Sequence, residues 1–177
     1  MLDVLPDNIG IVFCEGFRTL SQQKAYFDSK FLEVLQMIPN GYEAYVETTK
    51  HVSPFIKNIP THATGAAIDM RLFVQECGEN VLLDLGKFDV IFGPNDQQET
   101  FSENTTLLQR YNRLMLLEAA TKAGLANYGY EWWHYSYGDK MYAYVYGEPY
   151  AFYGLVTEED HSILSMTVQD YIKQITQ

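Results

Sequence analysis

The stretch Thr61-His62-Ala63-Thr64-Gly65-Ala66-Ala67-Ile68-Asp69 places a histidine and a carboxylate on either side of a glycine, in a run of small and apolar residues. A second cluster, Glu131-Trp132-Trp133-His134, adds another carboxylate and another histidine. Two imidazoles and two carboxylates on otherwise apolar segments are enough to build one catalytic metal site.

A catalytic zinc site needs three protein ligands from the His, Asp, Glu and Cys set, an open fourth position for water, and a nearby carboxylate that moves protons. His62, Asp69 and His134 can fill the three ligand positions. Glu131 can fill the role of proton carrier. A histidine on an apolar segment is also often a hydrogen-bonded core residue, so residue types alone leave both interpretations open.

The spacing within each cluster sets a condition on such a site. In a regular strand, residues separated by an odd number of positions point to opposite faces, and both His62 with Asp69 and Glu131 with His134 have odd separations. The metal site therefore requires a turn at Gly65 and a bulge or a strand end close to His134.

The bulk properties predict one folded domain covering residues 1–177. A chain of 177 residues is long enough for a substantial core. Its content of 47% hydrophobic and only 20% charged residues favours a globular protein over a disordered one. No internal repeat or linker divides the sequence.

The net charge and the cysteine content indicate which classes of partner and which cellular compartment to expect. The formal net charge of -11 disfavours nucleic acids and anionic membrane surfaces, because both are themselves negative. Cys14 and Cys77 form no Cys-x-x-Cys pair and indicate neither a disulfide framework nor a thiolate metal site. The sequence shows no secretory signal and no segment as long as a membrane span, so we expect a cytoplasmic protein.

Helices are predicted where apolar residues recur at helical spacing. One covers Ser21–Met37, with Ser21 as its cap and Pro39-Asn40-Gly41 as its stop. A second covers Thr105–Lys122 between a cap at Asn104 and a stop at Gly124, and a short one is expected within 163–175.

Strands are predicted where short apolar runs lie between turn signals. They cover Ile9–Cys14, a short run within Tyr42–Pro60, Ala66–Phe73, and the two arms of a hairpin, Ala126–Tyr137 and Met141–Tyr146. The stretch from Gln75 to Glu103 is expected to be an irregular excursion near the site. This order of elements predicts an α+β fold with a mostly antiparallel central sheet flanked by helices.

The two clusters, preceded by Gly16-Phe17-Arg18, resemble the D-alanyl-D-alanine dipeptidases of the vancomycin-resistance type. The resemblance runs from about Ile9 to Tyr137 and rests on His-x-x-Gly-x-Ala-x-Asp combined with Glu-Trp-Trp-His. It implies the hedgehog/D,D-peptidase-like fold of the zinc D,D-peptidases, one Zn²⁺ per chain, and a small D-dipeptide as substrate.

By position, the resemblance implies zinc ligands at His62, Asp69 and His134 and a general base at Glu131. It also implies a transition-state contact from Arg18, which suits an oxyanion because arginine stays charged. The patch Leu83–Asp89 is similar to a family segment whose final acid holds the ammonium of the dipeptide, so Asp89 is expected to bind substrate.

This chain departs from the family pattern in three places. The patch before Asp89 is one residue shorter than the corresponding family segment and lacks the threonine of that segment. Pro60 stands where relatives carry a substrate-binding serine, and Thr61 is the candidate to replace that hydroxyl. Only seventeen residues precede Arg18, so the N-terminal part is expected to be shortened relative to the family.

Several alternatives have sequence support. Three short stretches mimic the motifs of penicillin-binding proteins: Ser21-Gln22-Gln23-Lys24, Ser102-Glu103-Asn104 and Lys122-Ala123-Gly124. Lys122, however, falls at a helix end, where that architecture needs a strand. The aromatic run from Trp132 to Tyr146 suits packing within a hairpin better than stacking on single-stranded nucleic acid, given the negative charge. A D,D-carboxypeptidase that acts on longer peptides and a non-catalytic zinc-containing binding module remain open beside the dipeptidase.

Overall fold

The computed structural model describes residues 1–88, 97–156 and 161–177, except the side chains of residues 161 and 162. Asp89 therefore lies outside the described residues. Among the helices of these ranges, none is both long enough and apolar enough to cross a membrane.

The chain divides into two compact units, and each has its own hydrophobic core. The first unit contains Met1–Phe17 and Ala66–Tyr153, and the second contains Arg18–Gly65 and Gly154–Gln177. That residues 1–177 form one domain stays a prediction.

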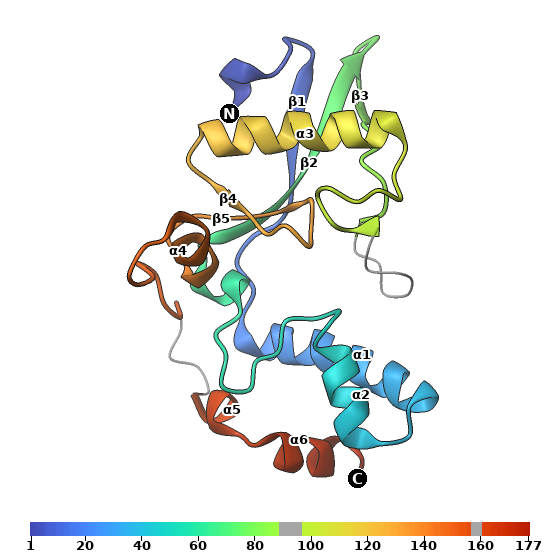
Figure 1. Cartoon of the computed structure of the whole chain (residues 1–177), viewed down its shortest axis with the longest axis vertical. Coiled ribbons are helices and arrows are strands. Elements are labelled where there is room, and N and C mark those ends of the chain that lie inside the picture. Colours follow the sequence, from blue (N-terminus) through green and yellow to red (C-terminus); the bar gives the residue numbers. More distant parts are fainter. Residues whose placement is uncertain (89–96, 157–160) are drawn as a thin grey trace. The chain divides into compact units, whose positions relative to one another are not determined.

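The first unit is built on an antiparallel sheet with the strand order β1-β2-β5-β4, in which β3 pairs with β2 (Figure 1). The strands are β1 Ile9–Glu15, β2 Ala67–Glu76, β3 Glu79–Leu82, β4 Ala126–Asn127 and β5 His134–Ser136. All pairings among them are antiparallel. The prediction of an α+β fold with a mostly antiparallel sheet is confirmed.

The long pairing of β1 with β2 forms the backbone of this sheet, and both strands run slightly further than the sequence predicted. Gly10 lies opposite Phe73, and a Cβ atom at Gly10 would lie only 2.3 Å from the Phe73 ring. The missing side chain thus lets the ring lie flat across β1. The register shifts between Phe13 and Glu15, close to the strand end.

Helix α3, Leu107–Lys122, lies across the sheet of the same unit (Figure 1). Its prediction is confirmed, but it begins at a different cap: Thr106 accepts a hydrogen bond from the backbone N–H of Gln109, whose side chain accepts from the N–H of Thr106 in return. This reciprocal pair satisfies two free N–H groups of the first turn. The helix buries Leu116, Ala119 and Ala120 in the same core cluster as Met70 and Leu72 of β2.

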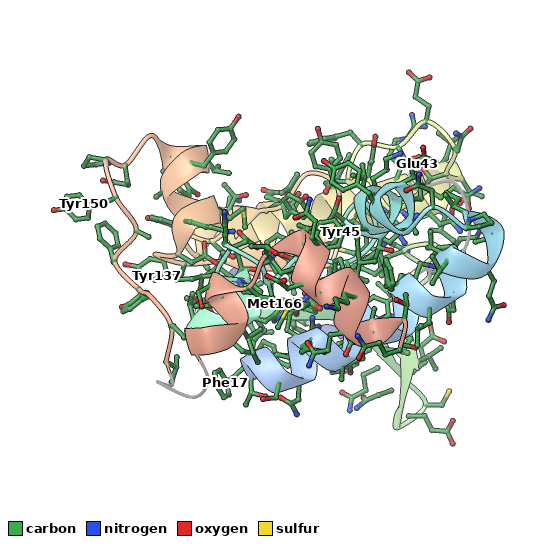
Figure 2. All side chains as sticks on the ribbon, turned by 90° about the horizontal axis from the view of Figure 1, so that it is seen from below. Phe17, Glu43, Tyr45, Tyr137, Tyr150 and Met166 are labelled. Carbon is green, nitrogen blue, oxygen red and sulfur yellow. The ribbon has the colours of Figure 1, made fainter. Side chains whose placement is uncertain are left out.

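The predicted hairpin arm Met141–Tyr146 is wrong, because these residues lie in helix α4, Lys140–Tyr146. Asp139 caps the helix by accepting from the N–H of Tyr142, and Gly147 ends it with φ of 70°. Tyrosines at every second position imitate a strand, yet Tyr142 and Tyr146 contact each other at a centroid distance of 4.7 Å, as residues four apart do on a helix. Tyr137 and Tyr150 lie beside this helix (Figure 2).

The second unit begins with α1, Leu20–Met37, which confirms the predicted helix with Thr19 in place of Ser21 as its cap. The predicted strand after it is wrong, because Gly41–Thr48 forms helix α2. Asn40 decides this outcome: its side chain accepts from two N–H groups of the first turn, so a residue that the sequence suggests as part of a helix stop instead starts the next helix.

The core of the second unit is a cluster of aromatic rings around Tyr171 of helix α6, Val168–Ile175. The Tyr171 ring is fully buried and contacts the rings of Phe27, Phe31, Tyr45 and Phe55 at 5.4–5.9 Å. Its hydroxyl donates to Asp28 at 2.9 Å. Together with α5, His161–Ser165, helix α6 divides the single short helix expected near the end of the chain into two.

We predict that Tyr171→Ala lowers the free energy of unfolding by about 3–5 kcal/mol, because it leaves a cavity among four rings. Urea unfolding followed by circular dichroism measures this change. The control Tyr42→Ala, at a side chain that is 58% exposed in the same unit, costs less than about 1 kcal/mol. Equal losses for the two variants would contradict a core centred on Tyr171.

Candidate metal centre

His62 lies on a single 3-10 turn, Thr61–Thr64, that follows Pro60. Gly65 ends the turn with φ of 68°, a left-handed conformation that favours glycine. The His62 side chain is buried. The backbone carbonyl of His62 accepts a hydrogen bond from the backbone N–H of Arg18 at 3.2 Å. The sequence condition of a turn at Gly65 is therefore met.

Asp69 on β2 and His134 on β5 lie directly opposite each other in the antiparallel ladder. Both side chains are buried, and His134 Nδ1 lies 3.1 Å from Asp69 Oδ1. Glu131 Oε2 lies 3.8 Å from the same nitrogen, and the Glu131 side chain is 30% exposed. One imidazole nitrogen thus faces two carboxylates.

His134 is the first residue of β5, and Glu131 stands in the turn before it. The prediction that the whole Glu131–His134 cluster lies on a strand is wrong. The N–H of Glu131 donates to the carbonyl of Tyr128 at 2.7 Å, and the N–H of His134 donates to the carbonyl of Glu131 at 3.2 Å. This turn lets two side chains three positions apart face each other, which a regular strand forbids.

His62, Asp69 and His134 each offer one ligand atom, and these atoms all lie within 4.8 Å of one another. Two imidazole nitrogens and one carboxylate oxygen are a donor set that suits Zn²⁺ and leaves a fourth position for water. All three side chains are buried. The residues present therefore fit a catalytic zinc ion.

The charges around His134 and its burial shift the pKa of the imidazole in opposite directions. Burial alone lowers the pKa of an imidazole, but the hydrogen bond to Asp69 and the charges of Glu131, Asp69 and Asp139 outweigh it, and the net pKa is raised above the usual value of 6.5. Without a metal, the imidazolium form is thus stabilised by the same carboxylates that would surround a cation.

Arg18 belongs to the second unit, where two contacts hold its guanidinium. Its Nη1 donates to Gln23 Oε1 at 2.7 Å, and the Tyr26 ring lies 4.7 Å from the guanidinium carbon. Gln23 is almost fully buried and donates from Nε2 to the carbonyl of Ser53 at 2.7 Å, so its oxygen is left for Arg18. Sequence reasoning missed Gln23, although a glutamine on the buried face of α1 is an unusual residue there.

The substrate contacts expected from Thr61 and Asp89 stay predictions. Thr61 opens the 3-10 turn, and its carbonyl accepts from the hydroxyl of Thr64 at 2.6 Å. Asp89 lies outside the described residues, whereas the carbonyl of Lys87 shortly before it accepts from Trp132 Nε1 at 2.8 Å.

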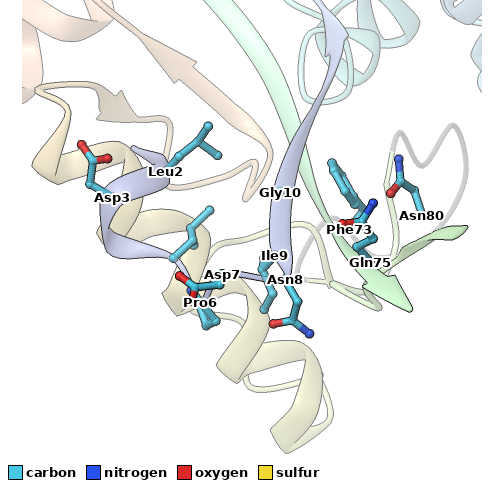
Figure 3. Close-up of a pocket in the computed structure, with 11 residues that line it drawn as sticks. Leu2, Asp3, Pro6, Asp7, Asn8, Ile9, Gly10, Phe73, Gln75 and Asn80 are labelled. Carbon is cyan, nitrogen blue, oxygen red and sulfur yellow. The ribbon is translucent and has the colours of Figure 1, made fainter. Parts of the chain in front are cut away.

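A surface hollow of about 500 Å³ lies elsewhere in the first unit, between residues 2–10 and residues 73–80 (Figure 3). Its lining includes Asp3, Asn8 and Gln75 but none of the residues predicted for the site. Gln75 is six positions along β2 from Asp69, which corresponds to about 20 Å. The hollow is therefore separate from the candidate metal centre.

Two comparisons with known proteins bear on this arrangement. A family model described as D-ala-D-ala dipeptidase matches residues 10–151. A D-alanyl-D-alanine dipeptidase of Enterococcus faecium is 22% identical over 135 residues, which cover 75% of this chain and 64% of that protein. The chain thus matches less than two thirds of the length of this curated relative.

In the metal-free protein, we predict that Asp69→Asn lowers the pKa of His134. The substitution removes one of the negative charges that raise this pKa against the lowering effect of burial. Ring-nitrogen NMR chemical shifts measured against pH report this value. Asp3→Asn, at an exposed carboxylate, is the matched control and leaves the His134 titration unchanged.

The raised pKa also predicts how the stability of the metal-free protein depends on pH. The contribution of the His134 proton to stability is fully present below pH 6.5 and is lost as the pH rises through the raised folded value. In Asp69→Asn this loss begins at lower pH. Identical pH dependence in both proteins would contradict the role of Asp69.

Proposed function

The chain belongs to the family of D-alanyl-D-alanine dipeptidases, and we propose that it is a zinc-dependent hydrolase that cleaves D-alanyl-D-alanine or a close D-dipeptide. The observation that carries this proposal is the buried group of His62, Asp69 and His134, with the Glu131 carboxylate 3.8 Å from His134 Nδ1. Three ligands beside a separate carboxylate are the minimum for peptide hydrolysis by an activated water.

His62, Asp69 and His134 would hold the zinc ion. When bound, zinc supplies Lewis acidity that brings the pKa of a water molecule towards neutrality and polarises the peptide carbonyl. His134 would hold the ion in its neutral form, because an imidazole nitrogen must be deprotonated to act as a ligand.

Glu131 is the proton carrier of the proposed reaction. Its carboxylate accepts a proton from the water as the water oxygen attacks the carbonyl carbon, and later delivers that proton to the departing amine as the C–N bond breaks. The partial exposure of this side chain suits the role, because the group must reach both water and leaving group. The products are two free amino acids, and Glu131 returns to its starting state.

Arg18 is proposed to hydrogen-bond the oxyanion that forms on the former carbonyl oxygen. Gln23 and Tyr26 hold its guanidinium, so little side-chain freedom remains to be lost when the oxyanion forms. Asp89 for the substrate ammonium and Thr61 for a further substrate contact complete the proposed set.

We predict that Glu131→Ala retains zinc but lowers kcat by about 100-fold to 10,000-fold, because only the proton carrier is lost. His134→Ala loses the metal itself. Metal analysis of the purified proteins and a D-alanine release assay measure both effects. The control Glu118→Ala removes an exposed carboxylate of the same unit and leaves both readouts unchanged.

Substrate length distinguishes the dipeptidase from a D,D-carboxypeptidase. We expect free D-alanyl-D-alanine to be cleaved with a higher kcat/KM than an N-acylated tripeptide or pentapeptide that ends in D-alanyl-D-alanine. A preference for the blocked peptides would instead establish the carboxypeptidase. Stoichiometric zinc without cleavage of any of these peptides would favour a binding module.

A further inference from the structure

A single amide side chain holds the turn that carries Glu131 and His134. Asn127, the last residue of β4, donates from Nδ2 to the carbonyl of Glu131 and to the carbonyl of His134, both at 3.1 Å. An amide nitrogen carries two hydrogens, so it can serve both acceptors at once. The two residues whose side chains face each other are therefore also tied through their backbones to one group.

Thr100 sets the orientation of this amide. Its hydroxyl donates to Asn127 Oδ1 at 2.6 Å, and the residue is almost fully buried. A flipped amide would aim its oxygen at two carbonyl oxygens, which only accept hydrogen bonds. The hydroxyl therefore secures the one orientation in which Nδ2 faces the turn.

The segment around Thr100 lies along the same turn through its backbone. The N–H of Thr100 donates to the carbonyl of Gly129 at 2.9 Å, and the N–H of Trp132 donates to the carbonyl of Gln98 at 3.0 Å. These bonds hold the turn on both sides of Glu131. The position of the turn thus depends on the position of residues 98–100.

Arg113 of helix α3 anchors that segment. It is 1% exposed, and it donates from Nη1 to the carbonyl of Glu99 at 2.7 Å and from Nη2 to the carbonyl of Gln97 at 2.9 Å. Its Nε donates to the carbonyl of Leu85 at 2.6 Å. A guanidinium presents several donors in a rigid plane, which suits the capture of three carbonyls.

We propose that Asn127 is a positioning residue that sets the place of Glu131 relative to His134, supported by Thr100 and Arg113. The inference rests on the proposed function, in which Glu131 carries the proton and His134 binds zinc. Removing the Nδ2 donor leaves two carbonyls with one fewer partner each and frees the turn. Outer hydrogen-bond partners of metal sites typically contribute about 10-fold to 100-fold in metal affinity or activity.

The test compares Asn127→Asp with wild type, because the substitution keeps the shape of the side chain and replaces the Nδ2 donor with a carboxylate oxygen. The negative charge that it adds is matched in the control. Asn112→Asp is the matched control: Asn112 is also buried and donates from Nδ2 to a carbonyl, that of Asp84 at 2.9 Å, in the same unit. Thr100→Val is the second variant, since it removes the hydroxyl with little change of volume. The measurements are kcat and KM for D-alanyl-D-alanine at saturating zinc, and the zinc dissociation constant by chelator competition.

We expect Asn127→Asp to lower kcat by about 10-fold to 100-fold with KM changed less than about threefold, and to weaken zinc binding by about 10-fold. Thr100→Val shifts kcat in the same direction by a smaller factor, and it decides the question if Asn127→Asp does not fold. Asn112→Asp lowers the thermal midpoint but leaves kcat and the zinc dissociation constant near wild type.

Two results would overturn the inference. The first is that Asn127→Asp keeps a kcat and a zinc affinity close to those of wild type. If Asn127→Asp does not fold, the same result for Thr100→Val overturns the inference. The second is an equal loss of both in Asn112→Asp, which would reveal general destabilisation. If wild type binds zinc but cleaves no D-dipeptide, the proposed function fails, while the zinc affinities of the same variants still decide the role of Asn127.

Discussion

The register between β2 and β5 is the constraint on which the candidate site depends, because it sets Asp69 opposite His134. A shift of one position would turn the Asp69 side chain to the other face of the sheet and separate it from the imidazole. The register is secured by burial on the same strand: Met70 and Leu72 share one face of β2 and are almost fully buried in the core, so a slip by one position would turn both away from it. The hydrophobic core thus specifies the geometry of a polar site.

Burying two histidines and a carboxylate opposes folding unless their polar atoms find partners. In the metal-free protein, Asp69 and His134 are partners of each other through a hydrogen bond, and the pKa of His134 is raised, which favours its protonated form. In the proposed zinc form, the three side chains would have the cation as their partner, and His134 would be neutral.

Most of the long elements follow from periodicity in the sequence, whereas short elements depend on single caps. Helix α3 and strand β2 were predictable because each carries its apolar pattern over many residues. In α2 and α4 the pattern is too short to distinguish helix from strand, and the side-chain caps of Asn40 and Asp139 decide the outcome. The Glu131 turn was only a condition deduced from odd spacing, since a hydrogen bond between Tyr128 and Glu131 leaves no periodic trace.

The sequence by itself determined which groups make up the candidate site: two imidazoles, two carboxylates and a glycine where a left-handed turn is needed. Those features are local, and a local signal survives without knowledge of the fold. Only the tertiary structure decided which side chains position the residues of the site. Asn127 and Thr100 hold the turn of Glu131 and His134, and Gln23 holds the guanidinium of Arg18. The hydrogen bond from Thr100 to Asn127 spans 27 positions of the chain, and no propensity or spacing rule relates side chains that meet only after the strands have paired.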